Sequence, residues 1–163
     1  MLDNRWKAYG LSAAVFAVDR LSKSIVEAHV SPFDVHPVIP GFFDIVHSQN
    51  RGVAFGLMSD STSAWRTVVL IVFSAAALIL VAGLLWKASR LDRWTAMGLA
   101  LVLGGAAGNL FDRILWGRVT DFLEFHIGDL HWPTFNVADS CIVVGSGLLL
   151  LELLRPKRQP AGA

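Results

Sequence analysis

The stretch at residues 67–86 constrains this chain more than any other feature, because it contains no charged side chain. Its sequence is TVVLIVFSAAALILVAGLLW. A helix needs about 20 predominantly apolar residues to cross the hydrocarbon core of a bilayer, and this stretch is long enough. A hydrophobic content of 54% and a mean hydropathy of +0.53 over 163 residues exceed the usual values for soluble proteins. The sequence therefore predicts an integral membrane protein.

Three further stretches are long enough to span a membrane, at residues 8–28, 94–111 and 135–154. Residues 30–63, between the first two predicted spans, contain several prolines and glycines around short apolar runs such as FFDIV (42–46) and VAFG (53–56). Such a pattern is typical of short strands and turns. The sequence thus predicts one all-α membrane domain over residues 1–163, with four transmembrane helices and a small extracytoplasmic β-rich segment between helices 1 and 2.

The distribution of basic residues predicts the orientation, since short cytoplasmic loops retain lysine and arginine. Eight of them flank the predicted spans on one side: Arg5, Lys7, Lys87, Arg90, Arg93, Arg155, Lys157 and Arg158. The longer segments on the other side contain only Arg51, Arg66, Arg113 and Arg118. Both termini are therefore expected to be cytoplasmic. A net charge of +1 gives no basic field that would favour a nucleic-acid partner.

Ionisable side chains inside spans are costly, so each one is a functional candidate. Asp19 and Lys23 are four residues apart in the first predicted span and share a helix face, where they can neutralise one another. A structural ion pair and a functional role both remain open for them. Arg20 is expected to point elsewhere and to extend toward the interface. Cys141, the single cysteine, cannot form an intrachain disulfide and is expected to be a small buried residue.

The sequence GGAAGNLFDR at residues 104–113 combines small and polar residues. Gly104 and Gly108 form a small-xxx-small pair, which favours the close approach of a neighbouring helix. Asn109 and Arg113 lie one turn apart at the outer end of the same span. Asp112, next to them, is expected to form a structural cap or an ion pair with Arg113.

Two aspartates are the candidates for chemistry. Asp121 follows the third predicted span, and Asp139 lies one turn into the fourth from the same side, so both carboxyl groups are expected at one depth. Two carboxyl groups in a site of low dielectric share a proton, which supplies one general acid and one general base. Asn136 precedes Asp139 by three residues and can orient a carboxylate or a peptide carbonyl. Ordinary polar caps at a helix start are the alternative.

Other catalytic chemistries lack support in the sequence. There is no HExxH, GxSxG, Walker or GxGxxG pattern, and the five histidines are scattered. We therefore expect no metal ion and no cofactor. A non-enzymatic small membrane transporter or assembly factor is an alternative function, although no inverted repeat supports a transporter.

Five ordered motifs carry a resemblance to a known family: VDRLSK (18–23), QNRGVAFG (49–56), GGAAGNLFDR (104–113), VTDF (119–122) and FNVADS (135–140). Together they resemble the lipoprotein signal peptidases, or signal peptidase II. The resemblance implies that Asp121 and Asp139 are catalytic. It also implies a set of supporting residues: Asp19, Lys23, Asn50, Gly52, Asn109, Arg113 and Asn136. Arg20 and Arg51 depart from the family pattern, which often has glutamine at the position of Arg20.

The resemblance also implies a substrate. It predicts an aspartyl endopeptidase that removes the signal peptide of bacterial prolipoproteins by cleaving just before a cysteine that carries diacylglycerol. The expected location is the bacterial inner membrane, with the active site toward the outer face and in contact with membrane lipid. We expect the protein to be monomeric.

Overall fold

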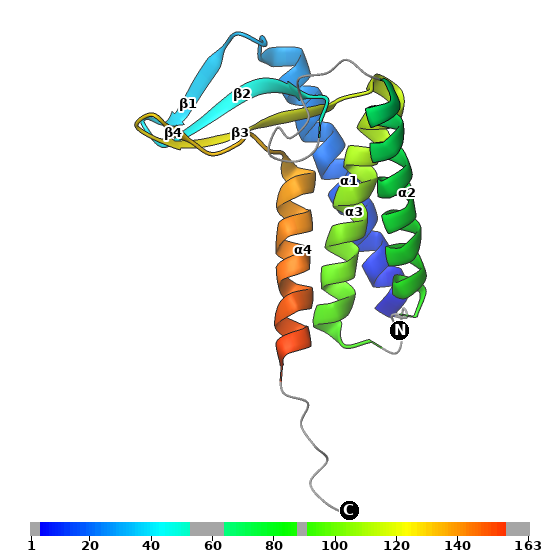
Figure 1. Cartoon of the computed structure of the whole chain (residues 1–163). Helices are drawn as coiled ribbons and strands as arrows, with labels where there is room; N and C mark the ends of the chain where they lie inside the picture. The colour runs from blue at the N-terminus through cyan, green and yellow to red at the C-terminus, as the bar shows by residue number, and fades with distance from the viewer. Residues whose placement is uncertain (1–3, 53–63, 88–90, 156–163) are drawn as a thin grey trace, which may run out of the picture.

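The computed structural model describes residues 4–52, 64–87 and 91–155, which form a bundle of long helices with a small sheet at one end (Figure 1). The helices are α1 (Asn4–His29), α2 (Ala64–Trp86), α3 (Arg93–Trp116) and α4 (Val137–Leu154). The strands are β1 (Val35–Ile39), β2 (Phe43–Asn50), β3 (Val119–Ile127) and β4 (Leu130–His131). The start of α1 and the end of α4 both lie at the end of the bundle away from the sheet.

Three of the helices described are long and apolar enough to cross a membrane, namely α3, α4 and residues 67–86 of α2. This result confirms three of the expected spans as helices of suitable composition. The fourth expected stretch, residues 8–28, also forms a continuous helix within α1. Its central charges at Asp19, Arg20 and Lys23 distinguish it from the other three, and its crossing of the membrane stays a prediction.

The sheet is antiparallel with the strand order β1-β2-β3-β4. The expected run FFDIV falls at the start of β2, whereas VAFG lies outside the described residues. Strands β3 and β4 were not expected, because the β-rich segment was placed only between the first two helices. The alternation of apolar and polar residues in LEFHI, at positions 123–127, is a signal for β3, but it covers only the last five of the nine residues of that strand.

Helix α3 lies among the other helices, and its glycines allow them to approach it. A Cβ atom on Gly104 would lie 2.6 Å from the backbone oxygen of Ser12 on α1. A Cβ atom on Gly105 would collide with the backbone oxygen of Ala138 on α4, and one on Gly108 with the carboxylate of Asp19. The close helix approach expected from Gly104 and Gly108 is confirmed. Cys141 on α4 is half-buried and not buried as expected.

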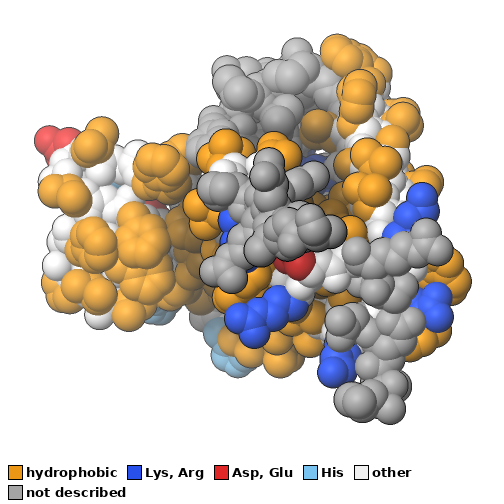
Figure 2. Space-filling view, turned by 90° about the horizontal axis from the view of Figure 1, so that it is seen from below, with side chains coloured by type: hydrophobic (Ala, Val, Ile, Leu, Met, Phe, Trp, Pro, Cys, Tyr) orange, Lys and Arg blue, Asp and Glu red, His pale blue; other side chains and the backbone are white. Residues whose placement is uncertain are grey.

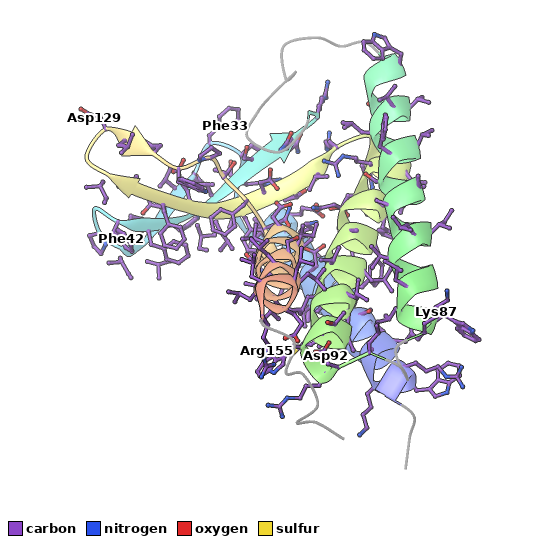
Figure 3. The ribbon with its side chains drawn as sticks, turned by 60° about the horizontal axis from the view of Figure 1, so that its bottom comes forward. Phe33, Phe42, Lys87, Asp92, Asp129 and Arg155 are labelled. Atoms are coloured by element: carbon purple, nitrogen blue, oxygen red, sulfur yellow. The ribbon has the colours of Figure 1, made fainter. Side chains whose placement is uncertain are left out.

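One surface of the sheet is rich in apolar side chains. Figure 2, which views the molecule from the end away from the sheet, shows them gathered over the sheet's underside. The exposed large apolar residues of the sheet and its turns are Phe33, Val35, Val38, Ile39, Phe42, Ile127, Leu130 and Trp132. Charged residues such as Lys87, Asp92 and Arg155 lie at the opposite end of the bundle (Figure 3). The molecule therefore has two chemically different ends.

Candidate active site

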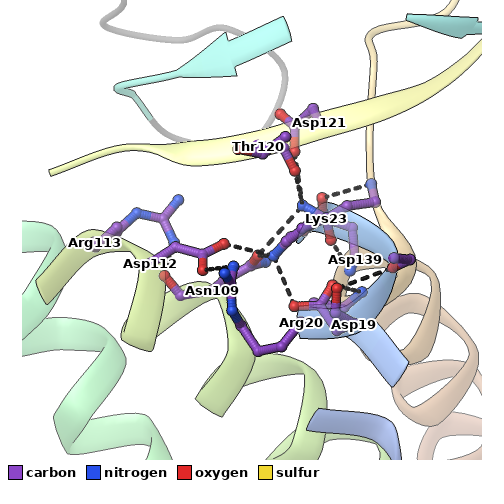
Figure 4. A network of polar contacts seen from close by, with 12 residues as sticks. Asp19, Arg20, Lys23, Asn109, Asp112, Arg113, Thr120, Asp121 and Asp139 are labelled. Carbon is purple, nitrogen blue, oxygen red and sulfur yellow. Dashed lines mark hydrogen bonds and ion pairs between the residues drawn. The ribbon is translucent and has the colours of Figure 1, made fainter. Parts of the chain in front are cut away.

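The two candidate aspartates come together where the sheet meets the helices (Figure 4). Asp121 lies on β3 and is 2% exposed, while Asp139 lies in the first turn of α4 and is half-buried. Asn136 caps α4: its Oδ1 accepts a hydrogen bond of 2.9 Å from the Asp139 backbone N–H. In return, Asp139 Oδ2 accepts one of 3.3 Å from the Asn136 backbone N–H. This reciprocal capping fixes Asp139 at the start of the helix.

Asn136 also joins the two aspartates. Its Nδ2 donates a hydrogen bond of 2.7 Å to Asp121 Oδ1, so one buried asparagine contacts both carboxyl groups. Asn109 on α3 donates from Nδ2 to Asp139 Oδ1 at 2.8 Å. The Oδ1 atom of Asn109 accepts from Asn136 Nδ2 at 3.3 Å and from Lys23 Nζ at 2.9 Å. These contacts set the amide orientation of Asn109, because its oxygen already faces two donors.

Three more of the expected supporting residues reach the pair from another side. Asn50, the last residue of β2, donates from Nδ2 to Asp121 Oδ2 at 3.1 Å. The backbone N–H of Gly52 donates to Asn50 Oδ1 at 2.8 Å, which orients that amide. Arg113 donates to the backbone oxygens of Gly52 and Asn109, both at 3.3 Å. The structure therefore brings Asn50, Gly52 and Arg113 into one network with both aspartates.

The environment of Asp121 favours its protonated form. Burial raises the pKa of Asp121 to about 6, and the negative charge of Asp139 acts in the same direction. The hydrogen bonds from Asn50 and Asn136 oppose this rise, as does the charge of Lys23. Two carboxyl groups coupled in this way hold a shared proton more strongly than isolated ones. The arrangement can supply one acid and one base at adjacent positions.

A buried ion cluster lies behind the pair. Lys23 Nζ is 2.7 Å from Asp19 Oδ2 and 2.8 Å from Asp112 Oδ2, and all three side chains are nearly inaccessible to solvent. The expected pairing of Asp19 with Lys23 is thus confirmed. Asp19 Oδ1 also accepts a hydrogen bond of 2.9 Å from the backbone N–H of Ala138, the residue before Asp139. Asp19 therefore connects α1 to the first turn of α4.

Two sequence expectations about this cluster were wrong. Arg20 does not extend to the interface: its Nη1 pairs with Asp112 Oδ1, and its side chain is only 15% exposed. Asp112 pairs with Arg20 and Lys23 instead of Arg113, whose guanidinium is directed at backbone oxygens. The physical reason is that a carboxylate as buried as Asp112 requires cations in contact with it, and α1 presents two.

The described residues contain no group of three or more histidine, cysteine, aspartate or glutamate side chains arranged to hold a metal ion. Two histidines of the sheet contact carboxyl groups other than those of Asp121 and Asp139. His126 Nε2 lies 3.1 Å from Asp44 Oδ2, and His131 Nδ1 lies 3.4 Å from Glu124 Oε1.

The family profile and two similar sequences agree on one family. The sequence profile of the family described as Signal peptidase (SPase) II matches residues 11–155. A lipoprotein signal peptidase of Solibacter usitatus is 63% identical over 161 residues, which are 99% of this chain and 98% of that protein. One of Sulfurihydrogenibium sp. is 38% identical over 92% of this chain and 93% of its own length. A solved structure titled "Bacterial membrane enzyme structure by the in meso method at 2.3 A resolution" has a TM-score of 0.81 and 26% identity, covering 94% of each chain.

Proposed function

This chain belongs to the signal peptidase II family, and from that premise we propose that Asp121 and Asp139 are its catalytic pair. The chain is accordingly a peptide hydrolase and not the transporter or assembly factor that the sequence alone had left open. The observation that carries the proposal is the position of Asn136, which contacts both carboxyl groups through its side chain and backbone. One buried residue thus donates to both carboxyl groups, from its side-chain amide to Asp121 and from its backbone N–H to Asp139.

The pair provides the two roles that amide hydrolysis requires. The ionised carboxylate takes a proton from a water molecule as the water oxygen attacks the scissile carbonyl carbon. The protonated carboxyl donates its proton to the carbonyl oxygen, which stabilises the tetrahedral intermediate. When the C–N bond breaks, the carboxyl that received the water proton donates it to the leaving amine. The hydroxyl proton of the intermediate returns to the other carboxyl, so the pair ends with one proton, as it began.

The substrate class follows from the relatives. Proteins named lipoprotein signal peptidase match this chain over nearly its whole length, so we assign it prolipoproteins as substrates. A diacylglyceryl cysteine would place the scissile bond near the membrane interface, because its acyl chains remain in one leaflet. The apolar underside of the sheet provides a surface for that interface. Contact with membrane lipid is part of the proposal.

The proposed topology has four membrane crossings, with α1 as the fourth. The charged side chains of α1 are compatible with a crossing because Asp19, Arg20 and Lys23 form a neutral set with Asp112 inside the bundle. The excess of lysine and arginine at the end away from the sheet supports cytoplasmic termini in a bacterial membrane. The catalytic pair then lies toward the outer face. A monomer is sufficient for this arrangement, since one chain supplies every group of the site.

The decisive test compares Asp121→Asn and Asp139→Asn with the parent on a precursor that carries diacylglyceryl cysteine. Each substitution keeps the shape of the side chain but removes its ionisation, so we expect cleavage to slow on the order of 10²-fold or more. Mass analysis of the product N-terminus measures the rate and identifies the bond cleaved. Thermal unfolding in detergent checks that each variant is folded.

Asp129→Asn is the matched control, because Asp129 lies in the turn between β3 and β4, where it is exposed and distant from the network. We expect this variant to cleave at the parental rate. The assignment is wrong if either Asp121→Asn or Asp139→Asn remains folded and cleaves nearly as fast as the parent.

A further inference from the structure

A continuous chain of polar contacts connects Arg20 to the pair (Figure 4). Arg20 Nη1 contacts Asp112 Oδ1, and Asp112 Oδ2 lies 2.8 Å from Lys23 Nζ. Lys23 Nζ donates to Asn109 Oδ1 at 2.9 Å, and Asn109 Nδ2 donates to Asp139 Oδ1 at 2.8 Å. A change at Arg20 can therefore reach Asp139 through groups in direct contact.

Arg20 determines the net charge of the buried cluster. Asp19, Lys23 and Asp112 carry two negative charges and one positive charge, which leaves one negative charge without a counterion. Arg20 supplies the missing positive charge through its contact with Asp112. An uncompensated charge is costly in a buried cluster and acts strongly on ionisable neighbours, since screening there is weak. With Arg20 present, the cluster behind the pair is neutral.

The position and chemistry of Arg20 keep this charge constant. Its guanidinium carbon lies 4.6 Å from the ring centroid of Trp116 and 5.4 Å from that of Phe111. Both rings belong to the outer half of α3 and hold the cation by cation–π interaction. A guanidinium does not lose its proton in proteins. The positive charge beside Asp112 is thus present at every pH at which the protein is folded.

We propose that Arg20 is a positioning residue for the reaction, because its positive charge balances the negative charge of Asp112. Lys23 can then hold Asn109, and no excess negative charge acts on the catalytic pair. The inference rests on the proposed catalytic role of Asp121 and Asp139. It concerns this chain in particular, because an uncharged side chain at position 20 would leave the cluster negative.

The expected effect on the pH dependence has a definite sign. In the part of the chain that the structure describes, the charged groups near the pair or its contact chain come from four elements: Asp19, Arg20, Lys23 and Glu27 from α1, Asp112 and Arg113 from α3, Asp121 from β3, and Asp139 from α4. Arg20→Gln makes this set more negative by one charge. Negative charge disfavours the loss of protons from the pair, so both limbs of the profile of kcat/KM against pH move to higher pH.

The experiment measures this profile for the parent and a set of variants that differ in the charge of the cluster. For Arg20→Gln we expect both limbs to move up by roughly half a unit to one unit. Asp112→Asn leaves one excess positive charge, so its limbs move to lower pH. The double variant Arg20→Gln with Asp112→Asn is neutral again and returns to the parental position. Arg20→Lys keeps the charge and the parental profile.

Lys7→Gln is the matched control, because Lys7 is exposed on the same helix about 20 Å from Arg20 at 1.5 Å per residue. It removes the same charge and should leave both limbs in place. A residue with only a structural role would lower the rate equally at all pH values. The proposal is overturned if Arg20→Gln does so, or if the double variant stays displaced.

Poor folding of Arg20→Gln does not prevent the test. The double variant differs from Asp112→Asn only at position 20, so it must titrate at higher pH than Asp112→Asn, and equal profiles overturn the proposal. Failure of the catalytic assignment is a different result, because it shows as cleavage by Asp121→Asn or Asp139→Asn. If those two variants are inactive and the profiles do not move, only the role of Arg20 is rejected.

Discussion

Helices α2 and α3 have similar lengths and opposite environments. In the most apolar stretch of each helix, only 6% of the residues of α2 are buried inside the protein, against 56% of those of α3. Helix α2 is also the more apolar of the two. In a bilayer the lipid tails are as apolar as leucine, so an apolar side chain gains little from leaving them. Polar and small residues therefore mark the buried helix, and the site forms on α3 and its neighbours.

The largest difference between the two helices should appear when a glycine is replaced by alanine and the stability and cleavage rate are measured. Gly105→Ala places a Cβ atom against the backbone oxygen of Ala138 and 2.9 Å from the side chain of Ile142, so α4 must move. Overpacking of this kind costs roughly 2–3 kcal/mol. Because Ala138 precedes Asp139, the same displacement should reduce cleavage by about tenfold or more. Thermal unfolding in detergent and the cleavage assay measure the two effects.

The control is Gly83→Ala on α2, where an added Cβ atom has no neighbour within 4 Å. This variant should be as stable as the parent or slightly more stable, since alanine favours a helix more than glycine does. Equal effects of the two substitutions would contradict the contrast between an exposed α2 and a buried α3.

The sequence predicted α2 more completely than α3 and its contacts. Apolarity alone identified α2, since nothing in residues 67–86 competes with a spanning helix. For α3 the composition identified the helix and the Gly104 approach, and the motif resemblance brought Asn109 and Arg113 into the site. The pairing of Arg20 with Asp112 was not predictable, because it depends on how α1 crosses α3. Strand β3 was missed for a similar reason, because its partner β2 precedes α2 and lies far away in the chain. Strand β4 pairs locally with β3, but its two residues are too few to give a sequence pattern.

The second prediction concerns the cost of burying Asp121. Its pKa in the folded protein, about 6, lies above the ordinary value of 3.8. The folded state therefore binds the proton more tightly than the unfolded state, and stability falls as the pH rises from about 4 to about 6. Asp121→Asn removes this ionisation. We expect the variant to be more stable than the parent by roughly 1–2 kcal/mol at neutral pH, while it loses cleavage.

Thermal unfolding at pH 4 and pH 7.5 measures this gain. The advantage of Asp121→Asn should be present at pH 7.5 and much smaller at pH 4, where Asp121 is protonated in the folded state and nearly half protonated in the unfolded state, whose pKa is 3.8. Asp129→Asn, on the exposed turn, should show no such pH-dependent difference. An advantage that is equal at the two pH values would mean that ionisation of Asp121 is not its source.

The smallest predicted effect compares a polar group in the network with one on α2. Asn50 donates to Asp121 Oδ2 at 3.1 Å, and this hydrogen bond favours the ionised carboxylate. In Asn50→Ala the pKa of Asp121 should rise further, and the pair should keep its shared proton to higher pH. The alkaline limb of kcat/KM, which follows the loss of that proton, should move up by roughly a few tenths of a pH unit.

Ser74→Ala on α2 removes a polar group that is remote from the pair, so its limb should coincide with that of the parent. If both variants keep the parental limb, the hydrogen bond from Asn50 does not influence the ionisation of Asp121. Asn50 is then not one of the residues that control the pair.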